Sequence, residues 1–426
     1  MLPRSLLLAT ALAVASGLPS MASAAEETLI GGNVDSLLDF ARSHHPAFAA
    51  LRLEAEAAAE RVAPAGALPD PMFRTELRDV TNEARGGSAN LLPARVGSAK
   101  YTLTQTLPWF GKRDLRRDVA VAGADEASGR TREGWLELAT RIKQTYAQHH
   151  VHLHTLRLMG ENLDLLQRLG EIARNRYANG LAPQQDAIRA QGEYTMLQSD
   201  LAMFEGESAQ ASARMRSLLG RPPAHIKLRP PNILRPLPAA AKLDFVALET
   251  RLRANNPQLA QDAARIAAAD KGRELTYRNR YPDVTLGVSP IQTRTRVSEW
   301  ELMFEVNIPL QQESRRAQER ESERLFEAAA RRHEATLHQA LADLGEALAG
   351  LEASRRVETL IATSLLPQAE LTLQSALAGY ETGKVDFAAV LDAQRQIRRA
   401  QQDLVKARGD QRLRLADIER LIGEEL

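Results

Sequence analysis

Apolar residues recur every three or four positions along most of this chain. The longest such stretch has no proline between residues 112 and 178. Its apolar positions include Leu138, Ile142, Leu156, Met159, Leu163 and Leu166. This spacing predicts one helix from Lys112 to about Ala178, roughly 100 Å long at about 1.5 Å per residue. A second apolar stripe lies on a neighbouring face and comprises Leu158, Leu165, Leu169 and Ile172. Two stripes predict that the helix packs against partners on two sides.

Shorter helical patterns flank the long one in both halves of the chain. Their ranges are 34–62, 183–219, 243–275 and 386–422. The first and third are each broken by an x-Pro pair, His45-Pro46 and Asn256-Pro257, and a proline fixes where the following helix begins. A second long helix is expected to run to Gly379. Pro367 is expected to kink it near its far end, because proline lacks the backbone N–H.

Four short segments show a different pattern, in which apolar and polar residues alternate. This pattern predicts strands over residues 70–81, 97–109, 283–291 and 298–310. The last is the clearest, and its apolar positions, which we expect to face lipid, are Trp300, Leu302, Phe304, Val306 and Ile308. Segments of about nine to thirteen residues suit tilted strands that cross a membrane with one face toward lipid.

The aromatic residues favour a membrane-spanning sheet. Only 4% of the chain is aromatic, yet eight of its nineteen aromatic residues lie in or beside these four segments. They are Phe73, Tyr101, Trp109, Phe110, Tyr277, Tyr281, Trp300 and Phe304, as an interfacial girdle would require. Because four strands cannot close a barrel, such a sheet requires several copies of the chain. The alternative is an amphipathic docking hairpin on a soluble periplasmic coiled-coil scaffold.

The two halves of the chain share one register. The equivalent pairs, each 203 residues apart, are Tyr177 and Tyr380, Gly180 and Gly383, Gln191 and Gln394, and Gly220 and Gly423. One unit has therefore been used twice. In each copy a Tyr-x-x-Gly sequence ends a long helix, because the glycine supplies a left-handed backbone conformation. We expect helical hairpins with tips at 177–184 and 380–386. The repeats would span 25–220 and 243–426, joined by a proline-rich connector at 221–242.

Composition and charge narrow the function. Residues 1–24 combine Arg4, an apolar run and a small-residue ending, which predicts a cleaved signal peptide and export. The chain has no cysteine, so we expect no disulfide, no thiolate metal site and no amino-terminal lipid anchor. A net charge of +1 gives no electrostatic reason to expect a nucleic-acid partner. No Gly-x-Ser-x-Gly, His-Glu-x-x-His or phosphate-binding glycine loop occurs, so we expect neither an enzyme nor a cofactor.

Two motifs carry a family resemblance. They are Gln105 to Arg113 (QTLPWFGKR), where a strand leads into a helix, and Tyr380 to Gln394 (YETGKVDFAAVLDAQ), at the second tip. With the duplicated order of elements, they make the mature chain resemble the TolC family of outer-membrane efflux factors. The first motif is most similar to the heavy-metal-resistance branch of that family.

The resemblance implies a mainly α fold with a small β part. Three copies would form a periplasmic α-barrel from their coiled-coil hairpins, and four strands from each copy would complete a twelve-stranded barrel in the outer membrane. It also implies a periplasmic membrane-fusion adaptor and an inner-membrane pump of the RND type as partners. The chain would be a passive exit duct, with heavy-metal cations as cargo. Drug or organic-compound efflux and type I secretion are the alternatives.

The resemblance also nominates residues at the tips. Asp392 matches an acidic position that narrows the channel in relatives, whereas a second acidic position three residues earlier is Ala389 here. Tyr380 matches a tyrosine that in relatives helps to latch the closed tip by hydrogen bonding. The basic partner seen there two residues after the glycine is Val385 here, and the adjacent Lys384 is the candidate in its place. The candidate adaptor contacts are Gly180, Leu181, Ala182, Gly383, Lys384 and Val385.

A histidine cluster at His149, His150, His152 and His154 invites a metal interpretation. His150 and His154 lie one helical turn apart and could touch a passing metal ion. Two histidines without a carboxylate or thiolate make a weak site, and a duct must release its cargo. We therefore expect no stable metal centre, and at most a transient contact at this pair.

Overall fold

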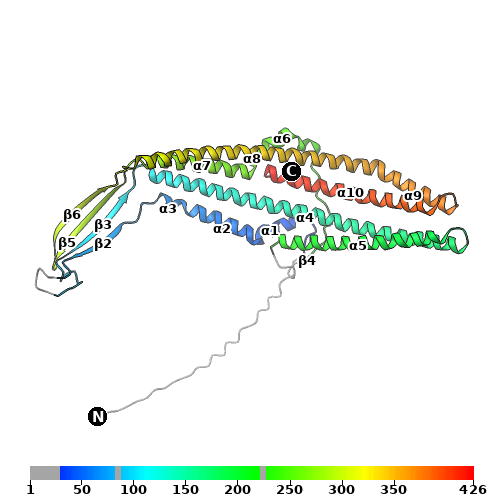
Figure 1. The fold of residues 1–426 in the computed structure, drawn as a ribbon, viewed down its shortest axis with the longest axis horizontal. Helices are drawn as coiled ribbons and strands as arrows, with labels where there is room; N and C mark the ends of the chain where they lie inside the picture. Colours follow the sequence, from blue (N-terminus) through cyan, green and yellow to red (C-terminus); the bar gives the residue numbers. More distant parts are fainter. Residues whose placement is uncertain (1–28, 82–87, 221–226) are drawn as a thin grey trace, which may run out of the picture.

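The computed structural model describes residues 29–81, 88–220 and 227–426. The chain is elongated, with a sheet at one end and the tips of two helical hairpins at the other (Figure 1). The signal peptide predicted at 1–24 and the start of the proline-rich connector, residues 221–226, lie outside the described residues.

Helices make up most of the described chain, as the apolar spacing predicts. Those of the first half are α1 (Val34–His44), α2 (Pro46–Glu60), α3 (Val62–Gly66), α4 (Lys112–Ala178) and α5 (Gln184–Leu218). Those of the second half are α6 (Phe245–Asn255), α7 (Pro257–Arg278), α8 (Gln312–Leu360), α9 (Leu366–Glu381) and α10 (Phe387–Ile422). The 67-residue α4 has the bounds that the uninterrupted pattern predicts. Prolines at the first positions of α2 and α7 mark both predicted breaks.

The expected irregularity near Pro367 is a short π-helical segment, η4 (Ile361–Leu365), between α8 and α9. The N–H of Leu366 donates to the carbonyl oxygen of Ile361, five residues earlier. One wider turn thus continues the helix into a residue that lacks an N–H.

The proline-rich connector contains two short elements that the sequence pattern does not reveal. Strand β4 (Lys227–Leu228) pairs in parallel with β1 (Leu29–Ile30), and η3 (Ala240–Leu243) is a turn of 3-10 helix before α6. A pair of two-residue strands is too short for an alternating pattern to be recognised.

Four antiparallel strands form the sheet, in the order β2-β3-β5-β6. They are β2 (Met72–Arg78), β3 (Ser98–Leu107), β5 (Val284–Thr293) and β6 (Arg296–Val306). The pairing of β3 with β5 joins the two halves of the chain. One row of facing residues crosses the whole sheet, from Phe73 through Leu103 and Val288 to Leu302. Leu302 is 88% exposed, so this row belongs to a continuous apolar face open to the surroundings.

The opposite face of the sheet is polar. Lys100 on β3 forms an ion pair with Glu301 on β6 at 2.5 Å. Beside it, the Ser289 hydroxyl donates to Thr102 Oγ1 at 2.9 Å. The alternation therefore separates an apolar surface from a hydrogen-bonded one, as a sheet between lipid and water requires.

The strand boundaries differ from those that the alternating pattern predicts, most of all at the end of β6. β6 ends at Val306, so Ile308, assigned to the strand over 298–310, lies beyond it. Pro309 cannot donate a ladder hydrogen bond, and it restricts the backbone of the residue before it. β5 continues past residue 291 to Thr293. The next residue, Arg294, adopts a positive φ of 60° in the two-residue turn that leads into β6.

Each return helix ends against one of the x-Pro breaks. Gly220, after α5, has φ +72°, and a Cβ there would lie 2.6 Å from Cδ of Pro46. Gly423, after α10, has φ +73°, and its Cβ would lie 2.3 Å from the carbonyl oxygen of Asn255. Only glycine satisfies both the backbone conformation and the close approach. In each half, the glycine that ends the return helix therefore packs against the x-Pro break.

A buried ion pair joins the two halves where the strands meet the helices. Lys112, at the start of α4, is only 3% exposed. Its Nζ donates to Oδ1 of Asp283 at 2.8 Å and to the Tyr281 carbonyl oxygen at 2.7 Å. Asp283 also accepts from the Trp109 N–H at 2.9 Å, and the Trp109 ring stacks on Tyr281 with centroids 5.4 Å apart. The first family motif thus builds a joint, which we call the Lys112 joint (Trp109, Lys112, Tyr281 and Asp283).

None of the helices within the described ranges is both long and apolar enough to cross a membrane.

We predict that Lys112→Ala destabilises the fold by about 2–3 kcal/mol, because it leaves a partly buried carboxylate without its cation. The thermal midpoint of the detergent-solubilised protein, followed by circular dichroism, should fall. Arg117→Ala is the matched control, because its ion contacts are long, 3.8 and 3.9 Å, and its side chain is 54% exposed. Equal midpoints for the two variants would contradict a stabilising role for the joint.

Candidate functional site at the helical tips

Both hairpins turn through the same backbone geometry. At the first tip the N–H of Leu181 donates to the Arg176 carbonyl oxygen at 2.8 Å, around Gly180 with φ +69°. At the second the N–H of Lys384 donates to the Gly379 carbonyl oxygen at 2.8 Å, around Gly383 with φ +74°. These bonds satisfy the last carbonyl groups of α4 and α9. The glycines therefore act as the sequence predicts.

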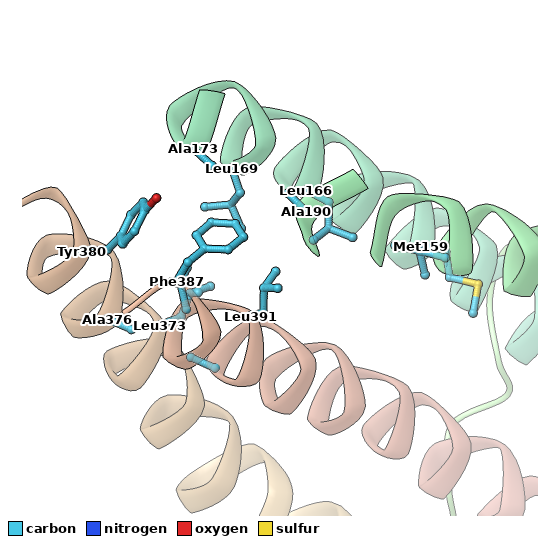
Figure 2. Packing of buried hydrophobic residues seen from close by; sticks show 13 residues of the cluster. Met159, Leu166, Leu169, Ala173, Ala190, Leu373, Ala376, Tyr380, Phe387 and Leu391 are labelled. Atoms are coloured by element: carbon cyan, nitrogen blue, oxygen red, sulfur yellow. The ribbon is translucent and has the colours of Figure 1, made fainter. Parts of the chain in front are cut away.

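The two hairpins share one hydrophobic core at this end of the molecule (Figure 2). Phe387, the first residue of α10, is 1% exposed and points toward Leu169 of α4 (Figure 2). Tyr380 is 4% exposed and lies at the end of the same cluster. Because α4, α5, α9 and α10 all contribute to this core, the tips form one packed unit.

Tyr380 joins the hairpins through a polar contact. Its hydroxyl donates to Oδ2 of Asp186, on the first turn of α5, at 3.2 Å. The Arg176 guanidinium lies 4.8 Å from the centre of the Tyr380 ring, and Arg176 also donates to the Glu381 carbonyl oxygen at 2.6 Å. Burial, and then the adjacent Asp186 carboxylate, raise the pKa of Tyr380, so the hydroxyl keeps its proton as a donor. We call this group of Tyr380, Asp186 and Arg176 the tip clasp.

The clasp is asymmetric between the two halves. Tyr177, the counterpart of Tyr380, is 47% exposed, and the counterpart of Asp186 in the second half is Ala389. Lys384, the candidate basic partner, is exposed and has no side-chain hydrogen bond or ion pair within the described residues. Arg176 provides the basic group instead. Sequence reasoning identified Tyr380 but missed Asp186, because nothing in a linear pattern pairs residues 194 positions apart.

Asp392 lies on α10 beyond the clasp. Its side chain is 63% exposed, and Oδ1 accepts from Arg395, one turn further along, at 3.1 Å. Arg395 also forms an ion pair with Glu193 of α5. Further along the two helices, Arg398 pairs with Asp200 at 3.3 Å. Asp392 is thus an exposed carboxylate at the edge of a charged seam between α5 and α10.

The residues proposed for adaptor contact lie on the outside of both turns. At the first tip Gly180 is exposed and Leu181 is 65% exposed, whereas Ala182 is half-buried. At the second, Gly383 and Lys384 are exposed. Val385 is half-buried against Gly379, where a Cβ would lie 2.5 Å from Cγ2 of Val385. Each tip therefore presents main chain and one long side chain to a partner.

The histidine cluster lies in the middle of α4. The rings of His150 and His154 stack with centroids 6.1 Å apart, and His152 lies 3.3 Å from the Glu207 carboxylate. Burial, followed by nearby positive charge, lowers the pKa values of His149, His150 and His154. The positive neighbours of the last two include Arg157, Arg408 and Arg412. Within the described ranges no three potential ligands gather around a common point, and the arginines would repel a cation.

The fold is that of channel proteins of the bacterial outer membrane. The outer-membrane channel OprN superposes with a TM-score of 0.78 at 17% identity, over 92% of this chain and 89% of that one. VceC from Vibrio cholerae superposes with a TM-score of 0.79 at 17% identity, over 92% of this chain and 96% of that one. CusC superposes with a TM-score of 0.78 at 18% identity, over 93% of both chains.

Sequence comparison gives the family. The model of the outer membrane efflux protein family matches residues 37–221 and 248–424, and the chain belongs to this family. It is 24% identical over 398 residues to the pyoverdine export outer membrane protein OpmQ of Pseudomonas putida, covering 86% of this chain and 81% of that protein. It is 25% identical over 227 residues to toxin and drug export protein A of Aggregatibacter actinomycetemcomitans, covering 53% of this chain and 48% of that protein.

Family membership confirms the predicted class, fold and location. The chain is an outer-membrane efflux channel of the kind that serves tripartite systems, with a periplasmic tunnel, and it is a transport duct rather than an enzyme. The alternative of a soluble periplasmic scaffold is therefore wrong.

We predict that Tyr380→Phe loosens the tip, because it removes a hydrogen bond to a buried carboxylate worth about 1.5–3 kcal/mol. In planar-bilayer recordings the variant should spend more time in high-conductance states. The matched control is Tyr177→Phe, at the equivalent residue of the first half. It should leave the currents unchanged, since Tyr177 lies outside the core. Unchanged currents in the Tyr380 variant would show that the clasp does not hold the tip closed.

Acidification should destabilise the middle of α4. A histidine whose pKa is lowered in the folded chain binds fewer protons there than when unfolded, so stability falls as pH drops below the ordinary value of 6.5. The thermal midpoint should therefore fall between pH 7.5 and 5.5. The fall should be smaller in the double variant His150→Gln, His154→Gln. The control is His338→Gln, at an exposed histidine on α8. An equal fall of the thermal midpoint in the parent, the double variant and this control would contradict the role of His150 and His154.

Proposed function

We propose that three copies of this chain close into a continuous exit duct that receives heavy-metal cations from an inner-membrane pump through a periplasmic adaptor. The adaptor would meet the helical tips, and cargo would leave through the sheet end. The observation that carries the proposal is the incompleteness of one copy, whose described sheet ends in unpaired strand edges and whose helical layer ends in exposed apolar stripes.

The helical edges support closure into a ring. Around the tips α5 packs on α4, α4 on α10, and α10 on α8 and α9, so α5 and α8–α9 are the outer members. The outer stripe of α5 exposes Ile188, Met196 and Met203, at 62%, 59% and 62%. The opposite edge exposes Leu360 and Leu371, at 64% and 66%. Joining α5 of one copy to α8–α9 of the next would bury both stripes.

The sheet edges support the same arrangement. Within the described strands, β2 and β6 each have one unpartnered edge, and backbone N–H and C=O groups in lipid require partners. Pairing β6 of one copy with β2 of the next would satisfy them. Such pairing would also place Glu301 and Glu305 of β6 near Arg74 of β2 on the polar face, where opposite charges attract.

The second tip supports cation cargo. Its exposed carboxylates are those of Glu381, Asp386 and Asp392. Repeated around a threefold axis, they would attract cations to the mouth of the duct. Organic compounds are the second candidate, because two relatives are named for export of pyoverdine and of toxins and drugs.

The cargo proposal predicts the behaviour of Asp392→Ala. In bilayer recordings under a salt gradient, the variant should lose part of the cation preference of the parent channel, because each copy loses one exposed carboxylate. In cells lacking the native protein, it should restore tolerance to divalent transition metals less well than the parent does.

Asp403→Ala is the matched control, since Asp403 is a 49% exposed carboxylate on the same helix, paired at 4.0 Å with Arg399. It lies further from the tip and should resemble the parent. If the parent protein restores tolerance to organic toxicants but not to metals, the second candidate replaces the first. Identical ion preference in the parent, Asp392→Ala and Asp403→Ala would show that Asp392 does not contribute to cation selectivity.

A further inference from the structure

Positive charge is concentrated where the strands meet the helices. The four junctions comprise residues 61–71, 109–120, 276–283 and 308–320, and together they hold ten basic and six acidic side chains. The whole chain carries only +1. The excess at the junctions is therefore a local feature of the fold rather than a general property of the chain.

Only part of this charge is neutralised. Arg280 pairs with Glu319 at 2.5 Å, and Lys112 pairs with Asp283 at 2.8 Å. Four exposed arginine side chains have no hydrogen bond or ion pair to any part of the chain that the structure describes. They are Arg61, Arg278, Arg316 and Arg320, which we call the junction collar.

Exposed apolar side chains lie at the same junctions. Phe110 is 84% exposed and Leu310 is 80% exposed, and Ile308 and Tyr281 are 67% and 46% exposed. Tyr281 directly precedes one strand and the other three residues directly follow two more, and the apolar face of these strands is itself exposed. Basic side chains next to exposed aromatic and aliphatic ones match the boundary between lipid headgroups and acyl chains.

We propose that the junction collar binds the anionic headgroups of phospholipids in the leaflet that faces the helices. The guanidinium groups would contact lipid phosphates, while Phe110 and Leu310 lie among the upper acyl carbons. This inference rests on the outer-membrane location of the family, and it does not depend on the cargo.

The chemistry favours lipid over a soluble anion. A guanidinium donates two parallel hydrogen bonds to phosphate oxygens, and several arginines near a charged surface add their attractions. Free phosphate would satisfy the arginines but leave Phe110, Ile308 and Leu310 exposed to water. A phospholipid satisfies both groups at once.

The test is lipid retention by the detergent-solubilised full-length protein, measured by native mass spectrometry. The protein is offered equal amounts of phosphatidylglycerol and phosphatidylcholine. The parent protein should retain phosphatidylglycerol in preference, and raising the ionic strength during loading should weaken that preference. The fourfold variant Arg61→Gln, Arg278→Gln, Arg316→Gln, Arg320→Gln should retain at least about tenfold less phosphatidylglycerol.

The matched control removes four exposed, unpaired arginines that lie away from the junctions. It is Arg157→Gln, Arg168→Gln, Arg189→Gln, Arg214→Gln, which changes net charge equally and should retain lipid as the parent does. Circular dichroism must show that both variants are folded. If the collar variant unfolds, the four single substitutions replace it, and each should lower retention.

Three results would overturn the proposal. They are equal retention of the two lipids by the parent, equal loss in the collar and control variants, and displacement of phosphatidylglycerol by inorganic phosphate at matched concentration. The last would identify a simple anion site. None of these measurements involves cargo, so a failure of the metal-transport proposal would leave their outcome unaffected.

Discussion

The buried Lys112–Asp283 pair is the contact on which the sheet end of the molecule depends. The chain leaves the helical layer, forms two strands and returns to it, once in each half, and the strands of the two halves meet only through β3 and β5. The ion pair has one partner from each half. It therefore holds together the two points at which the strands meet the helical layer. An unpaired ammonium at 3% exposure would be costly, so the joint tolerates only one arrangement of the two halves. The pair lies where the β3–β5 ladder ends and α4 begins.

At the other end of the molecule the halves are joined by apolar packing and by ion pairs between α5 and α10. Phe387, Leu169 and their neighbours form a single core across both hairpins, and the tip clasp is one polar contact at its margin. A hairpin can therefore move away from its neighbour only by losing this shared apolar core, the hydrogen bonds of Tyr380 and Arg176, and the ion pairs of Arg395 and Arg398. The sheet end cannot separate in this way, because seven residue pairs of the β3–β5 ladder and a buried ion pair hold it together.

Sequence periodicity predicts the parts of this fold that depend on local chemistry. The bounds of α4, both x-Pro breaks and the left-handed glycines at 180, 220, 383 and 423 follow from spacing and backbone preference. Contacts between the halves do not follow, because Asp186 and Tyr380, or Lys112 and Asp283, are brought together only by the tertiary fold. The strand over 298–310 was predicted too long because Ile308 continues the alternation, whereas the backbone ladder stops before Pro309. Side-chain pattern alone does not report where hydrogen bonding ends.

Two identical halves would form the tip clasp twice in each chain, once with each tyrosine. Here each half has kept a different member of the pair: the first has Asp186, with its tyrosine in solvent, and the second has Tyr380, with alanine at residue 389. The duplicated gene product has thereby divided one interaction between its halves, so that neither half could form it without the other. In the proposed ring of such chains, the two kinds of hairpin would therefore carry different contacts at their tips and would not be mechanically interchangeable.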